Sequence, residues 1–308
     1  MIVIVCPGQG AQAPGFLSPW LELPNFKSSI ERMQAASNID LITHGTISDA
    51  DTIRDTAIAQ PLIVGAGVAT VAALFENAGA KSAGIAGVSG HSVGEITAAV
   101  ISGIFTEEEG IKFVAERGRE MAKAAALETT SMAAILGGDQ SEVEAKLQSL
   151  DLEPANYNGG GQIVAAGSAE AIAALQAEPL AGTRVIPLQV AGAFHTRFMK
   201  PAVESLRTYA NGVAVQDPAM KIWSNNGGRE VTTGTEFVGL LVNQVSSPVR
   251  WDLCMQAMVQ AGVTALIEVA PAGTLVGLAK RSMPGIETLA VKTPENIEQA
   301  LLLINNHS

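Results

Sequence analysis

The sequence is poor in several kinds of residue, and each shortage narrows what the protein can be. Aromatic residues make up only 4% of the 308 residues although 47% are hydrophobic, so small aliphatic side chains must fill most of the core. Such a core favours helices packed closely on a parallel sheet over an aromatic-rich β-sandwich. We therefore expect an α/β fold.

Cysteine and basic charge are also scarce. Cys6 and Cys254, the two cysteines, lie far apart without C-x-x-C or zinc spacing, so we expect reduced thiols, no metal site and a cytoplasmic protein. The formal net charge of −11 excludes a general nucleic-acid binder or a protein held on an anionic membrane surface. A local basic patch is still compatible with this charge.

Long hydrophobic runs are missing too. The longest, 62–75, has 14 residues including two glycines, too few to cross a bilayer core of roughly 30 Å as a helix. We predict a buried helix that Pro61 opens at its first turn. Residues 1–5 are apolar without a basic leader and run into Pro7-Gly8, which favours a β-strand over a signal peptide.

The most informative segment that is present is 90–95, with the sequence GHSVGE. Glycines two residues on either side of Ser92 allow a sharp turn from a strand at 83–88 into a helix that starts at Glu95. The serine hydroxyl would then stand exposed, with helix amides directed at an acyl oxyanion. The pattern also fits an ordinary tight turn in a chain with 31 glycines, so its context decides.

A second strand, Ile2–Cys6, leads into a Gly-Gln-Gly turn in the same manner. Both turns should lie at strand carboxyl ends, where parallel sheets bind ligands, so Gln9 and Ser92 are expected to share one site. Another buried strand is predicted at 265–269.

The pattern changes between residues 127 and 191. Strands are predicted at 132–136, 155–157, 163–166 and 184–188, and helices at 141–150 and 169–175, which gives the β-α-β-β-α-β order of ferredoxin-like domains. We predict a small ferredoxin-like subdomain, 127–191, inserted into a large subdomain made of 1–126 and 192–308, with a cleft between the two.

A serine nucleophile needs a base, and the chain has four histidines. His307 lies at a terminus that frays, His44 lies in a loop-like segment, and His91 adjoins the serine, where neighbouring side chains diverge. His195 is the candidate base, although a surface histidine fits its pattern equally well. Because no convincing acid lies between Ser92 and His195, we expect a neutral carbonyl to orient the imidazole.

Together these residues resemble a known family, the malonyl-CoA:acyl carrier protein transacylases of fatty acid and polyketide synthesis. The resemblance extends over nearly the whole chain. Its segments are PGQGAQ (7–12), GHSVGE (90–95), RG (117–118), AFH (193–195), QVSSPVRW (244–251), EVAP (268–271) and GLAKR (277–281). The family's fold, an α/β-hydrolase-like large subdomain carrying a ferredoxin-like small one, agrees with the interpretation above.

The resemblance implies a ping-pong exchange that needs no cofactor and no metal. Ser92 attacks malonyl-CoA, CoA leaves, and the phosphopantetheine thiol of the acyl carrier protein takes the malonyl group. His195 would act as base and acid, the backbone amides of Gln9 and Val93 would form the oxyanion hole, and the carbonyl of Gln244 would orient His195.

The resemblance also assigns residues that bind substrate. Arg117 would hold the malonyl carboxylate with its guanidinium fork, although in isolation it fits an exposed helix arginine. Phe194 would fill the space that a methyl branch needs and so favour malonyl over methylmalonyl. Gln60, Asn158 and Gln162 match positions around the family's substrate mouth.

Two other functions are compatible with parts of the pattern. A serine hydrolase or thioesterase would use the same turn but deliver the acyl group to water, and an inactive interaction subunit would need none of these side chains. We favour the transacylase, as a monomer without nucleic-acid or membrane partners. Carrier proteins of this family are usually acidic, so we expect docking on basic residues drawn from Lys112, Arg119, Lys123, Arg197, Lys200, Lys280 and Arg281. The sequence leaves open whether the carrier serves fatty acid or polyketide synthesis.

Overall fold

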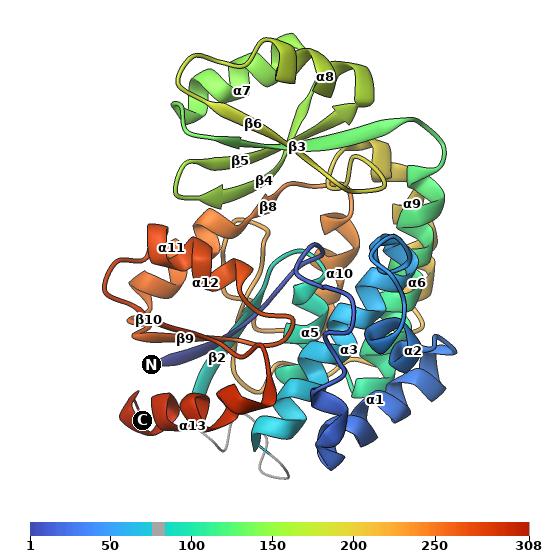
Figure 1. Ribbon diagram of the computed structural model, residues 1–308, viewed down its shortest axis with the longest axis vertical. Helices are drawn as coiled ribbons and strands as arrows, with labels where there is room; N and C mark the ends of the chain where they lie inside the picture. Colours follow the sequence, from blue (N-terminus) through green and yellow to red (C-terminus); the bar gives the residue numbers. More distant parts are fainter. Residues whose placement is uncertain (76–83, 308) are drawn as a thin grey trace.

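The computed structural model describes residues 1–75 and 84–307, which form two β-sheets surrounded by helices (Figure 1). The lower sheet in that view is parallel throughout, with the strand order β10-β9-β1-β2-β7. Its strands are β1 (Ile2–Cys6), β2 (Ile85–Gly90), β7 (Lys221–Trp223), β9 (Ala265–Glu268) and β10 (Glu287–Ala290). The predicted α/β fold is confirmed.

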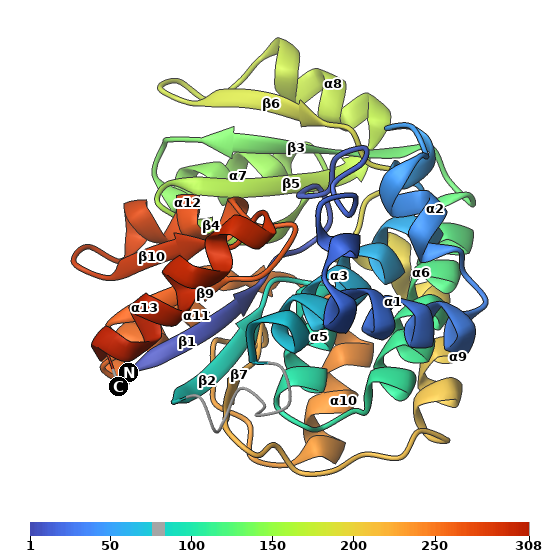
Figure 2. The same ribbon diagram turned by 60° about the horizontal axis from the view of Figure 1, so that its bottom comes forward.

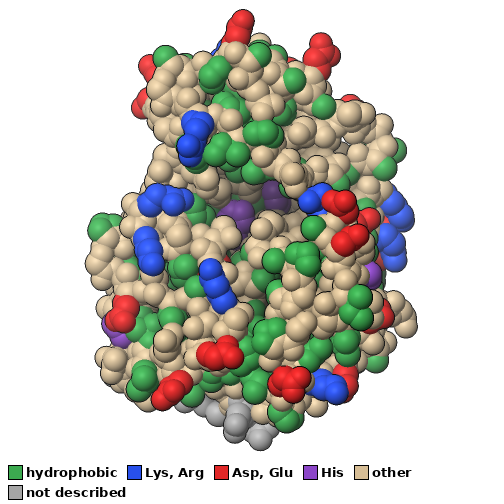
Figure 3. Space-filling model, viewed as in Figure 1, with side chains coloured by type: hydrophobic (Ala, Val, Ile, Leu, Met, Phe, Trp, Pro, Cys, Tyr) green, Lys and Arg blue, Asp and Glu red, His purple; other side chains and the backbone are tan. Residues whose placement is uncertain are grey.

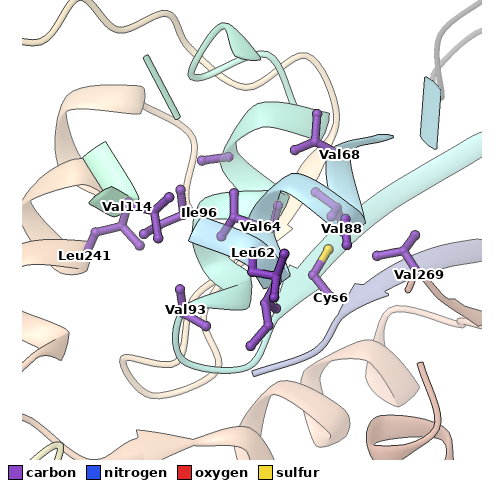
Figure 4. Packing of buried hydrophobic residues seen from close by; sticks show 14 of the residues in the cluster. Cys6, Leu62, Val64, Val68, Val88, Val93, Ile96, Val114, Leu241 and Val269 are labelled. Carbon is purple, nitrogen blue, oxygen red and sulfur yellow. The ribbon is translucent and has the colours of Figure 1, made fainter. Parts of the chain in front are cut away.

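Helices cover both faces of the parallel sheet (Figure 2). Ile2 and Ile4 of β1 lie in one hydrophobic cluster with residues of α3, α5 and α6, whereas Val3 and Val5 lie in a second cluster with residues of α11 and α12. Figure 4 shows part of the first cluster. Because both faces are buried, β1 is an unbroken apolar run rather than an alternating one. The helices are α1 (Pro24–Ser37), α2 (Leu41–Thr46), α3 (Thr56–Phe75), α5 (Gly94–Ile101), α6 (Glu107–Ala125), α9 (Lys200–Ala210), α10 (Gly234–Gln244), α11 (Trp251–Gln260), α12 (Thr274–Ser282) and α13 (Ile297–His307).

The upper sheet has the strand order β6-β3-β5-β4-β8, and α7 (Gln140–Ser149) and α8 (Ala169–Ala177) lie on its outer face (Figure 1). Its strands are β3 (Thr130–Leu136), β4 (Glu153–Gly159), β5 (Gln162–Ser168), β6 (Arg184–Leu188) and β8 (Val249–Arg250). From β3 to β6 the elements follow in the order β-α-β-β-α-β. The sequence did not predict β8, which pairs in parallel with β4 and ties the C-terminal part of the chain to this sheet.

Helix α3 begins earlier than predicted. It starts at Thr56, so Pro61 lies inside the helix and not at its first turn. Burial of the helix on all sides offsets the cost of the hydrogen bond that proline cannot make. By length and composition α3 could cross a membrane, but 78% of its most apolar window is buried in the protein, as befits a core helix.

Several strand boundaries, in β2, β3, β4, β5 and β9, also differ from the prediction by one or two residues. β2 begins at Ile85 and continues to Gly90 because its last residue pairs with Cys6 of β1. Ala83, the predicted start, lies outside the described residues. β9 ends at Glu268, one residue before the predicted end.

Candidate active site

Ser92 stands in a sharp turn between β2 and α5. Its φ is 52°, a left-handed conformation that strains a residue with a side chain. The flanking glycines are sterically required, because a Cβ on Gly90 would lie 2.0 Å from the backbone of Gly94, and one on Gly94 would lie 2.1 Å from the carbonyl oxygen of Cys6. The turn thus holds the serine at the carboxyl end of the parallel sheet.

Ser92, His195 and Gln244 form one hydrogen-bonded chain. The Oγ of Ser92 lies 2.7 Å from Nε2 of His195, and Nδ1 of His195 lies 2.8 Å from the backbone oxygen of Gln244. Since a carbonyl only accepts, Nδ1 carries the proton and Nε2 is left free to accept from the serine hydroxyl. Burial and then the charge of Arg117 lower the pKa of His195 to about 3. The imidazole is therefore neutral and ready to take a proton.

Arg117 of α6 is buried beside the nucleophile, with only 1% of the residue exposed. Its Nη1 donates to Oε1 of Gln60 at 2.7 Å and its Nη2 donates to Oε1 of Gln244 at 2.8 Å. The same Nη2 lies 3.5 Å from the Oγ of Ser92, and Nε is buried without a partner among the described residues. Burial lowers the pKa of Arg117 to about 10, so the guanidinium is still charged at neutral pH.

A buried polar network beneath the turn was not predicted from the sequence. Asn225 accepts a hydrogen bond from the backbone N–H of Ser92 at 2.8 Å and donates to the carbonyl of Gly90 at 2.7 Å. Glu95 accepts from the backbone N–H of Asn225 at 2.6 Å and from the side-chain amide of Gln244. These contacts span up to 149 residues along the chain, and no local spacing in the sequence reveals them.

The backbone N–H groups of Gln9 and Val93 bond to no acceptor among the described residues. Both residues line a cavity of about 90 Å³ around Ser92, together with Gln60, His91, Met121, Met132, Asn156, Leu188, Val190, Phe194 and His195. Arg117 does not line it and lies behind Gln60 and Ser92. Figure 3 shows a hollow between the upper and lower parts of the molecule, with histidine side chains inside it and Lys and Arg side chains along its left rim.

Asn158 and Gln162 line a neighbouring cavity of about 250 Å³ that shares Gln9, His91, Asn156 and Leu188 with the first. Nε2 of His91 lies 2.9 Å from Oδ1 of Asn158, whose amide donates to Oε1 of Gln162 at 3.0 Å. His91 lines the same cavity as Ser92. His91 nevertheless bonds to the upper sheet and not to the serine.

The other two histidines lie elsewhere. Nδ1 of His44 lies 3.0 Å from the hydroxyl of Ser48, and His307 pairs with Glu287. Neither His44 nor His307 lines the cavity around Ser92.

The structure divides the seven candidate docking cations into two groups. Lys112, Arg119, Lys123 and Arg197 are each paired with acidic side chains. Lys200, Lys280 and Arg281 make no ion pair with any residue that the structure describes. The last three are thus the cations available to an acidic partner.

The arrangement suits acyl transfer. A hydroxyl on a strained turn, a neutral imidazole held by a carbonyl, and two unused backbone donors are the parts that a covalent acyl intermediate requires. The buried guanidinium adds a site for an anionic group next to the nucleophile.

Comparisons with known proteins agree with this chemistry. Residues 3–296 match the acyl transferase domain family. The malonyl CoA-acyl carrier protein transacylase of Mycobacterium tuberculosis is 46% identical over 303 residues, which cover 97% of this chain and 99% of the relative.

Solved structures show the same likeness. The crystal structure of MCAT from Mycobacterium tuberculosis superposes with a TM-score of 0.94 at 45% identity, covering 98% of this chain and 99% of that one. A malonyl-transacylase in complex with its type II PKS acyl-carrier protein superposes with a TM-score of 0.92 at 26% identity, covering 98% and 99%.

Proposed function

Because the chain belongs to the acyl transferase domain family, we propose that it moves the malonyl group of malonyl-CoA to the phosphopantetheine thiol of an acyl carrier protein. The observation that carries the proposal is the buried guanidinium of Arg117, whose Nη2 lies 3.5 Å from the Oγ of Ser92. Malonyl carries a free carboxylate that needs such a cation in a site shielded from water.

In the first half-reaction Ser92 becomes malonylated. Nε2 of His195 takes the hydroxyl proton as Oγ attacks the thioester carbonyl carbon, and the backbone N–H groups of Gln9 and Val93 hold the oxyanion. The carbon–sulfur bond then breaks, and the CoA thiolate leaves with the proton from His195. The 2.8 Å contact between His195 and the backbone of Gln244 supports this role, because it fixes the required tautomer.

In the second half-reaction the carrier thiol gives its proton to His195 and attacks the malonyl ester. The ester bond breaks, Oγ of Ser92 recovers the proton, and the malonyl group leaves on the carrier. No metal or cofactor takes part in either step.

The malonyl carboxylate binds Arg117 by replacing the oxygen of Gln60 that Nη1 now contacts at 2.7 Å. Gln60 lines the cavity and stands between it and the guanidinium, which supports this exchange. Phe194 narrows the cavity and selects against a methyl branch. Asn158 and Gln162 contact the pantetheine arm in the neighbouring cavity.

The two sheets correspond to two subdomains in this proposal. Residues 1–126 and 192–308 make an α/β-hydrolase-like large subdomain, and residues 127–191 make a ferredoxin-like small one. The strand order β6-β3-β5-β4 and the nucleophile turn after β2, an interior strand of the parallel sheet, support these assignments. The protein acts as a cytoplasmic monomer, in which the buried thiols of Cys6 and Cys254 stay reduced.

Mass spectrometry of the intact protein tests the function directly. After incubation with malonyl-CoA, we expect a malonyl adduct on Ser92 that disappears when phosphopantetheinylated carrier protein is added and reappears on the carrier. Release of free malonate at the same rate without carrier would identify a thioesterase instead. Absence of any adduct would favour an inactive subunit.

A further inference from the structure

Glu95 follows the nucleophile turn directly, and the two half-reactions above do not use it. It lies in the first turn of α5 with 1% of the residue exposed. Its Oε1 accepts the backbone N–H of Asn225 at 2.6 Å, and its Oε2 accepts Nε2 of Gln244. Among the residues that the structure describes, none of its hydrogen bonds reaches His195, so Glu95 is not the acid of a Ser-His-acid triad.

The side chain of Gln244 has a defined orientation. Its Oε1 accepts from Nη2 of Arg117 at 2.8 Å, whereas its Nε2 faces acceptors, namely the carboxylate of Glu95, the backbone oxygen of Ser92 at 3.2 Å and Oδ1 of Asn225 at 3.2 Å. A guanidinium only donates and a carboxylate only accepts. The amide therefore fits between Glu95 and Arg117 in one orientation and not in the other.

We propose that Glu95 is a positioning residue for substrate recognition, which locks Gln244 so that Oε1 holds Arg117 in place for the substrate carboxylate. The inference rests on the proposed malonyl transfer. Gln244 also holds His195 through its backbone carbonyl, so one residue fixed by Glu95 contacts both the base and the recognition cation.

This role belongs to the ionised form of Glu95, because only a carboxylate accepts at both oxygens. Burial raises the pKa of Glu95 to about 8, while donors from Asn225, Ser224 and Gln244 and the charge of Arg117 act in the opposite direction. The other titratable group that faces Glu95 is Cys254 of α11, whose pKa burial raises to about 12, so the thiol is neutral. With its pKa near 8, the carboxylate form of Glu95, in which both oxygens accept from N–H donors, dominates above that pH.

Substitution of Glu95 by glutamine should reverse the orientation of the Gln244 side-chain amide. The new side chain has a single acceptor oxygen, which the backbone N–H of Asn225 occupies, so its NH₂ group must face Nε2 of Gln244. Two donors cannot pair, and Gln244 must turn its oxygen toward position 95 and its NH₂ toward Arg117. The recognition cation then loses its partner with almost no change in side-chain volume at position 95.

The test compares kcat/KM for malonyl-CoA and acetyl-CoA, both measured with carrier protein at a pH of about 9, where the carboxyl group of Glu95 is ionised. We expect Glu95→Gln to lower the malonyl-to-acetyl ratio about ten- to a hundredfold. The ratio isolates recognition, because a disturbed Ser92 or His195 slows both substrates alike. An equal loss for both substrates would reduce Glu95 to a structural role and overturn the proposal.

Gln244→Met provides a second, independent test of the malonyl-to-acetyl ratio in case Glu95→Gln does not fold. It keeps the backbone carbonyl that holds His195 and removes the amide, so the ratio should fall as it does in Glu95→Gln. The double variant should show no further fall, because Glu95 acts through that amide. An unchanged ratio in Gln244→Met, or additive effects in the double variant, would contradict the proposal.

Glu268→Gln is the matched control. Glu268 is equally buried and accepts backbone hydrogen bonds from Leu275 at 3.0 Å and Val276 at 2.9 Å, and in the described part of the chain it makes no hydrogen bond to Gln244. Its variant should lower the Tm and keep the ratio. A wild-type protein that fails to malonylate the carrier would refute the proposed function, whereas a selective wild type with an equally selective Glu95→Gln would refute only the role of Glu95.

Discussion

Nη2 of Arg117 lies 3.5 Å from the Oγ of Ser92, so the buried cation and the nucleophile touch. The charge of Arg117 also lowers the pKa of His195, second only to burial. A carboxylate bound to Arg117 would offset that charge and make His195 a stronger base. Substrate recognition and activation of the serine are thereby coupled through one side chain.

Replacement of the nucleophile should abolish the covalent intermediate. Ser92→Ala removes the Oγ that pairs with His195, and loss of a member of such a unit typically costs about three to six orders of magnitude in rate. Intact-protein mass spectrometry after malonyl-CoA should show no adduct. A malonyl adduct mapped to another residue of the variant would contradict the assignment of Ser92.

Replacement of Arg117 should change which acyl group is accepted. In Arg117→Ala the malonyl carboxylate enters a buried site without a partner, which costs roughly 3–5 kcal/mol, or a few hundred- to several thousand-fold in kcat/KM. Acetyl-CoA has no carboxylate to lose and should react as well as before or better. Both substrates are measured at one salt concentration, and an equal fall for both would show that Arg117 supports the fold or binds CoA.

The rate of acylation should be insensitive to pH around the usual pKa of histidine. The neutral form of His195 is active, and a pKa lowered from 6.5 to about 3 keeps that form dominant until the pH falls toward 3. We therefore expect kcat/KM for malonyl-CoA to lack an ascending limb near pH 6.5, within the range where the protein stays folded. A limb near 6.5 that disappears in His91→Ala would assign the base to His91 instead.

The free energy of unfolding should depend on pH because the pKa values of His91 and His195 are lowered in the folded protein. His91 and His195 both have lowered pKa values in the folded protein, so the unfolded chain binds more protons below pH 6.5. The part of the free energy of unfolding that depends on these two residues is therefore present at pH 7 and above and is lost progressively as the pH falls below 6.5. Urea titrations of the wild type and the two His→Gln variants between pH 5 and 8 measure this loss, and equal slopes for all three would argue against it.

The basic residues without an ion pair in the described part of the chain should contribute to binding of the carrier protein, whereas those already paired with acidic side chains should not. Charge reversal of Lys280 and Arg281 should slow the carrier half-reaction, and added salt should weaken that half-reaction more than acylation by malonyl-CoA, because rim charges mainly raise association rates. Lys112→Glu is the control, since Lys112 is already paired with Glu108. An equal salt response of both halves would exclude this docking surface.

The two glycines of the turn should be irreplaceable, unlike an otherwise similar glycine. In Gly94→Ala the new Cβ would lie 2.1 Å from the oxygen of Cys6, so the variant should not fold into the native turn. In Gly239→Ala of α10 no atom lies within 4 Å of the new Cβ, and the helix should gain about 0.5–1 kcal/mol. Thermal unfolding of both variants checks the contrast.

Local patterns in the sequence revealed those parts of the protein that local sterics determine. The Ser92 turn could be predicted because only glycine fits at Gly90 and Gly94, and the strands of the upper sheet could be predicted from short β-branched runs bounded by helical stretches and glycine turns. The start of α3 could not be predicted, because proline usually occupies the first turn of a helix, whereas burial of the whole helix lets Pro61 lie inside it. The prediction that the carbonyl of Gln244 orients His195 came from the family resemblance.

The hydrogen bonds around Glu95 could not be predicted from the sequence, for a different reason. Its members lie far apart in the chain, and each is an ordinary polar residue in its own segment. The partner of His91 could not be predicted for the same reason, because Asn158 comes from the opposite sheet. Contacts of this kind depend on how the two sheets face each other, which no local pattern encodes.

The reacting residues and the residues that shape the cavity come from different sheets, and this separation affects how the substrate preference of such a protein can evolve. Ser92, His195, Gln244, Gln9 and Val93 all belong to the parallel sheet and its connections, whereas the upper sheet contributes the roof of the hollow through Met132, Asn156, Asn158, Gln162 and Leu188. Mutations in the roof can alter the shape offered to an incoming acyl group without moving a reacting atom. New substrate preferences are thus accessible by small steps that each keep a working catalyst, in evolution or in the laboratory.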